Sequence, residues 1–420
     1  MRLILLLLAL YTGTISCTAQ PHALKTSTTY QAKQVRTGAD RMEVYLPLLK
    51  NKKVAVFANP TSMVAKQHLV DTLLKSGIEV VKIFGPEHGF RGDADAGEHV
   101  GDAKDKKTGI PVVSLYGNHK KPTADDFKNV DILIFDIQDV GVRFYTYISS
   151  LEYFLEAALE NRKPLLILDR PNPNGFYVDG PVLDKKFKSF IGMQPIPIVH
   201  GMTIGEYALM LAGENWLSDK ANAANAYNLN TKPTADTAFH VQVIKCTNYD
   251  HKSIYELPVN PSPNLREMQS IYWYPSTCFF EGTVLSEGRG TDKPFQYFGH
   301  PTLPKTLFSF TPKPNEGAKS SKCFYQKCYG WNLAGSTSEV LQKIDGKIQL
   351  KFLLEAYRLF PGKDSFFLKN NFIDKLAGND VLQKQVKQGL TEEAIRATWL
   401  PGLTAFKVIR KKYLLYKDFE

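Results

Sequence analysis

The stretch KVAVFAN at residues 53–59 decides the fold, because it is a short apolar run that a helical pattern follows at 67–76. In that second segment the apolar residues recur at helical spacing. Further apolar runs occupy 79–84, 112–116, 131–137 and 165–169, and a helix is expected at 146–161. Near-continuous Val, Ile and Leu runs separated by amphipathic helices are typical of a parallel sheet covered on both faces. The sequence therefore predicts an α/β fold with a Rossmann-like parallel sheet.

The length of the chain favours two domains. Its 420 residues exceed the size at which a single hydrophobic core usually stops growing. Residues 259–264 read VNPSPN, a turn-forming run that predicts a boundary or a rigid crossover. We expect a Rossmann-like catalytic domain at 33–260 and a smaller α+β domain at 261–420 that completes a cleft, with helices at 351–359 and 391–399.

The N-terminus predicts export. Met1 and Arg2 precede an apolar run at 3–11 and a small, polar stretch at 12–16, the order of a signal peptide. The run is too short to span a bilayer, which takes about 20 residues. Residues 14–17 read TISC and resemble a loose lipobox ending at Cys17, with ordinary cleavage a few residues later as the alternative.

We therefore expect a signal peptide at 1–17 and a linker at 18–32. The protein should be periplasmic or associated with the outer membrane. Modification of Cys17 would make it a lipoprotein with a membrane tether.

Charge and motifs exclude several functions. The net charge of +10 suits an anionic wall polymer or a solvated lysine surface, but no dense basic block supports nucleic-acid binding. Residues 58–62 read ANPTS where a dinucleotide-binding turn would carry glycines, so no cofactor is predicted. No H-E-x-x-H or other defined ligand spacing predicts a metal. Besides Cys17, the chain has four cysteines that either pair or stay as buried thiols: Cys246, Cys278, Cys323 and Cys328.

Three loops after predicted strands carry polar side chains. They read GPEHGFRG at 85–92, DIQDVGVRFY at 136–145 and DRPNPNG at 169–175. Open parallel sheets bind ligands beyond the carboxyl ends of their strands, because the loops and helix N-termini converge there. We expect the three loops to meet at one crevice.

Glu87 is the candidate general acid. It lies between Pro86 and His88 in a glycine-framed turn, which should fix the direction of its carboxyl group. Partial burial would keep such a group protonated. The alternative is a structural carboxylate that binds Arg91 or caps a helix. His88 is a second catalytic candidate, although a single histidine is more often structural.

Asp136, Asp139 and Asp169 are the candidates for a second carboxylate, which would stabilise an oxocarbenium-like transition state, activate water or orient the substrate. Each could instead bind Arg143 or Arg170, and the sequence does not choose among them. These two arginines could also hold a substrate carboxylate bidentately. Further candidates for substrate binding are Arg91, Gln138, Tyr145 and Asn172, together with Glu281, Glu287 and Arg289 on a second, glycine-rich rim that could equally be a salt-bridged loop.

Four blocks resemble the signature of one family. They read FGPEHGFRG at 84–92, FDIQDVGVRFYTY at 135–147, LDRPNP at 168–173, and EGT at 281–283 with SEGRGT at 286–291. These blocks resemble those of the NamZ-type exo-β-N-acetylmuramidases, formerly a family of unknown function. The resemblance implies release of β-1,4-linked N-acetylmuramic acid from the non-reducing end of peptidoglycan fragments, without a cofactor, in a cleft between two domains. It also implies that Glu87 is the acid.

Two other functions stay open. One is an exo-hexosaminidase with another amino-sugar specificity, which chromogenic N-acetylmuramic acid and N-acetylglucosamine substrates would distinguish. The other is a non-catalytic lipoprotein that binds muropeptides, for which binding would persist without turnover. In each case the partners are peptidoglycan-derived sugars.

Overall fold

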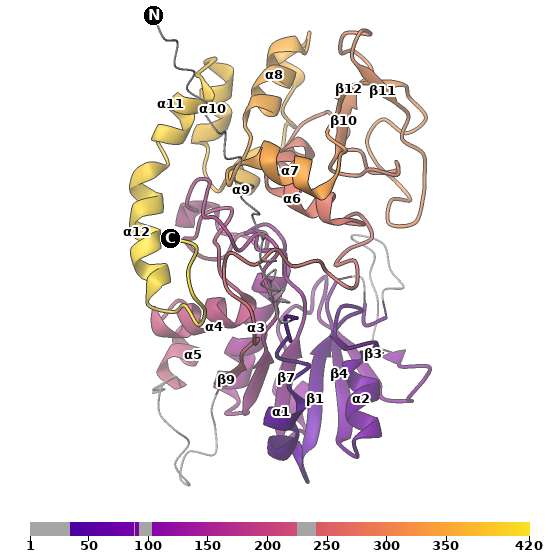
Figure 1. Cartoon of the computed structure of the whole chain (residues 1–420), viewed down its shortest axis with the longest axis vertical. Coiled ribbons are helices and arrows are strands. Elements are labelled where there is room, and N and C mark those ends of the chain that lie inside the picture. The colour runs from indigo at the N-terminus through magenta and orange to yellow at the C-terminus, as the bar shows by residue number, and fades with distance from the viewer. Residues whose placement is uncertain (1–33, 88, 92–102, 225–240) are drawn as a thin grey trace, which may run out of the picture. The chain divides into compact units, whose positions relative to one another are not determined.

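The computed structural model contains a sheet of seven strands in the order β5-β6-β4-β1-β7-β8-β9, in the lower half of Figure 1. All of its strand pairs are parallel except β5 with β6. Without the edge strand β5, this is the doubly wound order of a Rossmann-like sheet, so the predicted fold class is confirmed. The strands are β1 (Lys53–Ala58), β4 (Glu79–Gly85), β5 (Ala103–Lys104), β6 (Pro111–Ser114), β7 (Ile132–Asp136), β8 (Leu165–Leu168) and β9 (Val241–Ile244).

The structure describes residues 34–87, 89–91, 103–224 and 241–420. The predicted signal peptide, Cys17, the linker and His88 lie outside the described residues. In the part that is described, no helix combines the length and the apolar character that a membrane crossing needs.

Both faces of the sheet are buried, which explains the near-continuous apolar runs. Side chains of successive strand residues point to opposite faces. Val54, Val56 and Ala58 of β1 join the core under α1 (Met42–Leu49) and α2 (Leu69–Lys75). Ala55 and Phe57 of the same strand join the core under α3 (Tyr147–Glu160).

The helix expected at 67–76 starts two residues later. Residues 67 and 68 form β3 (Gln67–His68), which pairs with β2 (Met63–Val64). Nδ1 of His68 accepts a hydrogen bond of 3.2 Å from the Val70 amide and so caps α2. The other elements of this half are η1 (Asp125–Phe127), η2 (Lys185–Phe187), α4 (Ile204–Gly213) and α5 (Asp219–Ala224).

After the crossover at 259–264 the chain forms a three-stranded antiparallel sheet and a set of helices. The larger hydrophobic core contains residues from both sides of this crossover, and Val35–Glu420 form one compact unit. The elements are α6 (Met268–Thr277), η3 (Cys278–Gly282), β10 (Tyr297–His300), β11 (Phe308–Phe310), β12 (Cys328–Asn332), α7 (Thr337–Ile344), α8 (Lys351–Leu359), η4 (Lys363–Ser365), α9 (Phe372–Ala377), α10 (Val381–Lys387), α11 (Glu392–Ala397) and α12 (Leu400–Lys411).

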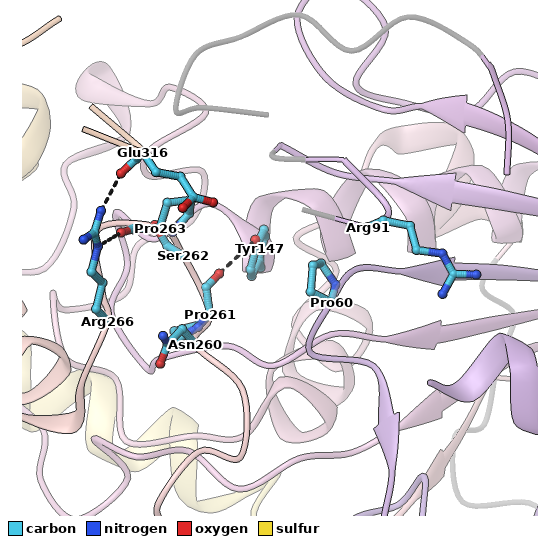
Figure 2. A pocket seen from close by; sticks show the side chains of 9 residues that line it. All are labelled: Pro60, Arg91, Tyr147, Asn260, Pro261, Ser262, Pro263, Arg266 and Glu316. Atoms are coloured by element: carbon cyan, nitrogen blue, oxygen red, sulfur yellow. Dashed lines mark hydrogen bonds between the residues drawn. The ribbon is translucent and has the colours of Figure 1, made fainter. Parts of the chain in front are cut away.

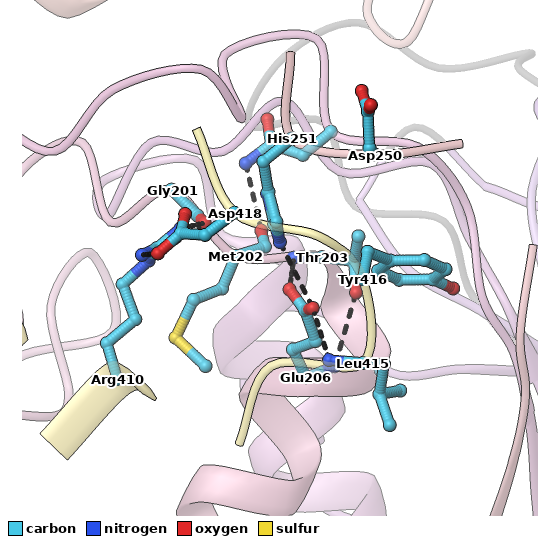
Figure 3. A network of polar contacts seen from close by, with 12 residues as sticks. Gly201, Met202, Thr203, Glu206, Asp250, His251, Arg410, Leu415, Tyr416 and Asp418 are labelled. Carbon is cyan, nitrogen blue, oxygen red and sulfur yellow. Dashed lines mark hydrogen bonds and ion pairs between the residues drawn. The ribbon is translucent and has the colours of Figure 1, made fainter. Parts of the chain in front are cut away.

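The C-terminal tail returns to the first half of the chain, as Figure 3 shows. Nη2 of Arg410 donates a hydrogen bond of 2.7 Å to the Gly201 carbonyl, and the Leu415 amide donates one of 2.7 Å to Glu206 Oε1. The same carboxylate lies 3.1 Å from Nε2 of the buried His251. The tail therefore binds the loop before α4 and α4 itself through buried polar groups.

Candidate active site

A cavity of about 390 Å³ lies beyond the carboxyl end of the parallel sheet (Figure 2). Loops after β1 and β4, the start of α3 and the crossover form its wall. Because the strand order reverses between β1 and β7, this is the crevice where an open α/β sheet is expected to bind a ligand. The lining residues are Pro60, Arg91, Tyr147, Asn260, Pro261, Ser262, Pro263, Arg266 and Glu316.

Glu87 lies on a closed turn in the same loop as Arg91, which lines the cavity. The Gly89 amide donates a hydrogen bond of 3.0 Å to the Pro86 carbonyl, and Gly89 has a φ of +76°, which glycine adopts without a steric penalty. The glycine-framed turn is therefore confirmed. Glu87 is half-buried, and the Tyr116 hydroxyl donates a hydrogen bond of 3.1 Å to its Oε1.

The charge of Glu87 affects the pKa of two tyrosines. Burial, followed by the nearby Glu87 carboxylate, raises the pKa of Tyr116 to about 12. The same two causes raise the pKa of Tyr147, which lines the cavity, above its ordinary value. The carboxyl group thus lies within electrostatic reach of the cavity wall.

Asp136 and Arg170 form an internal ion pair. Nε and Nη2 of Arg170 contact the two carboxylate oxygens of Asp136 at 2.6 and 2.9 Å. Both side chains are buried, Asp136 completely. This ion pair is the structural alternative given for these residues, and a contact of either side chain with substrate stays a prediction.

Arg143 is also structural. It is 1% exposed, and its guanidinium donates to the carbonyls of Pro181, Ile196 and Leu376 at 2.8 to 2.9 Å. Burial lowers its pKa to about 9. Arg143 therefore connects the first half of the chain to α9, and its contact with a substrate carboxylate stays a prediction.

Asp169 and Asn172 hold loops together. Asp169 accepts hydrogen bonds from the Thr203 hydroxyl at 2.8 Å, the Gly205 amide at 2.8 Å and the Tyr416 hydroxyl at 2.6 Å. Nδ2 of Asn172 donates to the Met202 carbonyl at 2.9 Å. Both groups are buried and bonded within the protein, and their contacts with substrate stay predictions.

Gln138 and Tyr145 bond to the backbone of loops at the crevice. Nε2 of Gln138 donates to the carbonyls of Asp139 and Pro171 at 2.8 and 2.7 Å. The Tyr145 hydroxyl donates to the Pro261 carbonyl at 2.7 Å. Both side chains are buried and position loops, and their predicted contacts with substrate stay predictions.

Asp139 differs from the other two aspartates. Its Oδ2 accepts from the Gly141 amide at 2.6 Å, and its buried Oδ1 has no hydrogen-bond partner among the described residues. Burial raises its pKa to about 7. Its charge contributes to the raised pKa of both Tyr145 and Tyr147, which places it near the cavity wall.

His200 is a neighbour that the sequence did not reveal. Its Nε2 lies 4.0 Å from Oδ2 of Asp139 and has no hydrogen-bond partner among the residues described. Burial lowers the pKa of His200 to about 3, so the ring is neutral.

The second rim is a salt-bridged loop. Arg289 lies 2.6 Å from Glu281 and 3.3 Å from Glu287, and Lys322 lies 2.8 Å from Glu287. The structural alternative for this rim is therefore confirmed. Lys322 was not anticipated, because it is 35 residues from its partner.

The cysteines and the acidic and histidine side chains form no metal site in the described ranges. All four cysteines of this region are free thiols, and three of them are buried: Cys246, Cys278 and Cys328. Cys323 is partly exposed.

Two family models cover most of the chain. The N-terminal model of the exo-β-N-acetylmuramidase NamZ matches residues 54–269, and the C-terminal model matches 272–416. The chain belongs to the NamZ-type exo-β-N-acetylmuramidase family. A curated relative, the peptidoglycan β-N-acetylmuramidase NamZ of Bacillus subtilis strain 168, is 38% identical over 96% of this chain and 96% of its own length.

Two crystal structures share the fold of this exo-β-N-acetylmuramidase family member. Both are DUF1343 family proteins from Bacteroides fragilis NCTC 9343. One has a TM-score of 0.80 and 45% identity over 92% of this chain and 99% of its own. The other has a TM-score of 0.74 and 29% identity over 91% of this chain and 99% of its own.

In this family member the sequence reasoning missed Tyr116, Tyr147, Asn260 and Arg266. Tyr147 ends the quoted FYTY string, and Asn260 lies in the crossover that had been considered only as a boundary. Both residues thus lay in segments that the sequence had singled out, although neither carries an acidic or basic side chain of the kind sought for catalysis. Tyr116 and Arg266 had no local signal, because their importance comes from strands and loops that meet only in the folded chain.

Proposed function

We propose that this protein releases N-acetylmuramic acid from the non-reducing end of peptidoglycan fragments, with Glu87 as the general acid. The observation that carries the proposal is the Glu87 carboxyl, which is held by Tyr116 and acts electrostatically on Tyr147 of the cavity wall. Family membership and the identity to a curated peptidoglycan β-N-acetylmuramidase favour this substrate over other amino sugars.

The size of the cavity suits a terminal sugar. Its volume of about 390 Å³ is near the lower end of the range of about 300 to 1,000 Å³ that is common for ligand pockets. A hollow of this size accommodates a terminal unit better than the middle of a polymer. This size agrees with the exo-action of the family.

Glu87 would protonate the glycosidic oxygen as the bond to the leaving sugar breaks. The turn at 86–89 and the Tyr116 hydroxyl limit the directions that its carboxyl group can take. Limiting these directions keeps the donor aligned with a bound glycosidic bond and lowers the entropic part of the barrier.

Asp139 is the best supported second carboxylate. Asp136 is neutralised by Arg170, and Asp169 accepts from four donors, whereas Oδ1 of Asp139 has no partner within the described ranges. Asp139 and Glu87 both act on the pKa of Tyr147. We assign Asp139 the role of stabilising positive charge that develops on the sugar ring, either directly or by orienting the substrate.

Export is part of the proposal. A signal peptide at 1–17 would bring the protein to the periplasm or the outer membrane, where peptidoglycan fragments arise, and modification of Cys17 would tether it there. Palmitate labelling of cells that express the wild type or Cys17→Ala tests the tether. We expect label only in the wild type; equal labelling of both would contradict it.

The activity test uses a disaccharide with N-acetylmuramic acid at its non-reducing end. We expect mass analysis to find free N-acetylmuramic acid and the second sugar. A disaccharide with N-acetylglucosamine at that end should stay intact. Equal cleavage of both would indicate a hexosaminidase of broader specificity, and saturable binding without cleavage would indicate a binding protein.

A further inference from the structure

The cavity wall holds two guanidinium groups in different electrostatic states. Arg91 is neutralised, because it lies 2.9 Å from Asp105 and 3.4 Å from Asp71. Figure 2 shows its guanidinium turned away from Tyr147 and the other lining residues. Arg266 stands on the opposite wall, and within the described residues it forms no ion pair. Among the described lining residues, Arg266 is therefore the cation without a carboxylate partner.

Backbone carbonyls hold the Arg266 side chain. Its Nε donates a hydrogen bond of 2.7 Å to the Pro263 carbonyl, and its Nη2 donates to the Glu316 carbonyl. Carbonyl groups orient a guanidinium without cancelling its charge. No described residue accepts a hydrogen bond from Nη1, so this nitrogen keeps its donors for a ligand.

The segment that carries Arg266 is itself fixed. The Tyr145 hydroxyl donates to the Pro261 carbonyl at 2.7 Å, and the Tyr147 hydroxyl reaches the same oxygen at 3.3 Å. On its other side, Nδ2 of Asn264 donates to the Gly317 carbonyl at 2.7 Å. A guanidinium on such a segment loses little freedom when it binds a ligand.

We propose that Arg266 binds the carboxylate of the lactyl ether on the terminal N-acetylmuramic acid and is the residue that selects this sugar. The inference rests on the function proposed above. N-acetylmuramic acid differs from N-acetylglucosamine by this lactyl group, so a carboxylate-binding cation is what discriminates them. Arginine suits the task because its planar fork matches a carboxylate. The nearby carboxylate of Glu316 is exposed to water, which screens its repulsion.

This assignment replaces the expected role of Arg143 and Arg170. Those arginines are buried and bonded within the protein, whereas Arg266 is half-buried on the cavity wall. The assignment also gives substrate specificity and acid catalysis to residues of different segments. Glu87 comes from the loop after β4, and Arg266 comes from the crossover.

The test compares the wild type with Arg266→Met on chromogenic N-acetylmuramic acid and on its analogue with the lactyl carboxylate converted to a carboxamide. A charge-assisted hydrogen bond to a carboxylate should make the KM of Arg266→Met for the acid about 10- to 100-fold higher, with kcat within about threefold. The carboxamide should show little difference between the two enzymes. Arg358→Met, at an exposed position on α8, is the matched control and should behave as the wild type.

The outcomes separate the two proposals. A wild type that cleaves neither substrate contradicts the proposed function. A wild type that cleaves, together with an Arg266→Met enzyme of unchanged KM for the acid, overturns only the role of Arg266. If Arg266→Met does not fold, the wild-type KM values for the two substrates are compared instead. We expect the KM for the carboxamide to exceed the KM for the acid at least about tenfold. Equal KM values overturn the inference.

Discussion

The Tyr116 hydroxyl donates a hydrogen bond of 3.1 Å to Oε1 of Glu87. Tyr116 follows β6 and Glu87 follows β4, and these two strands are parallel neighbours in the sheet. Residues 29 positions apart in the chain therefore meet at one edge of the sheet. The contact fixes the orientation of the carboxyl group that the proposed mechanism uses.

Tyr116→Phe should lower kcat about five- to tenfold while KM stays within about twofold, because the loss of one hydrogen bond costs about 1 kcal/mol. The effect falls on kcat because the hydroxyl positions the acid and is not proposed to bind the sugar. Steady-state kinetics on the chromogenic substrate measure both constants. Tyr325→Phe, at a position 72% exposed, is the control, and an unchanged kcat in Tyr116→Phe would remove Tyr116 from the account.

Glu152→Gln should change how stability depends on pH. Glu152 is buried in α3, where Oε1 accepts from Nε2 of Gln194 at 2.6 Å and burial raises the pKa to about 8. In the unfolded chain this carboxyl titrates near 4.5, so between about pH 4.5 and 8 the folded state holds a proton that the unfolded state has lost. Its contribution to stability is therefore full below pH 4.5 and is lost as the pH rises to 8.

Urea denaturation at pH 5, 6.5 and 8 measures this dependence. We expect the wild type to lose stability from pH 5 to 8 more steeply than Glu152→Gln, which carries no titrating group there. Parallel profiles for the two proteins would show that the buried carboxyl is not protonated in the fold.

Tyr416→Phe should destabilise the fold by about 1 to 3 kcal/mol, because it removes the acceptor of the Cys246 amide and one of the donors to the buried Asp169 carboxylate. The hydroxyl donates to Asp169 at 2.6 Å and accepts from the Cys246 amide at 2.8 Å. The free energy of unfolding from denaturant titration measures the change, and Tyr325→Phe should stay within about 0.5 kcal/mol of wild type. Equal stability of the two variants would mean that the tail does not hold the loop after β8.

Arg170→Met should cost about 3 to 5 kcal/mol, because it leaves the buried charge of Asp136 uncompensated. The double variant Arg170→Met with Asp136→Leu removes both charges and should be less destabilised than either single variant. Denaturation of all three proteins tests this ordering. Additive losses in the double variant would contradict a mutual ion pair.

The sheet could be predicted because each strand is marked by its own run of apolar residues. Burial on both faces makes each strand a continuous apolar run, as Phe57 in one core and Val56 in the other illustrate. The loops that follow these runs could be predicted too. The sequence therefore placed Glu87 directly after the carboxyl end of a strand. β9 was missed because its burial is only partial at two of four residues, so its pattern is weak.

The roles of the polar loop residues were not predictable, because the same side chain serves binding or structure according to partners that are distant in sequence. Asp169 is bonded to Tyr416, 247 residues later, and Arg143 to the carbonyl of Leu376. A pattern of residues that are close in the sequence contains neither contact. Arg266 shows the converse, since only the folded crossover places it on the cavity wall.

Turnover of the N-acetylmuramic acid disaccharide by Glu87→Gln tests the central claim most directly. The matched control is Glu79→Gln, at the exposed start of the same strand. We predict that Glu87→Gln lowers kcat at least about 100-fold, the effect of losing a positioned proton donor, while the sugar still binds. A rate close to that of Glu79→Gln would contradict the account and place the acid elsewhere.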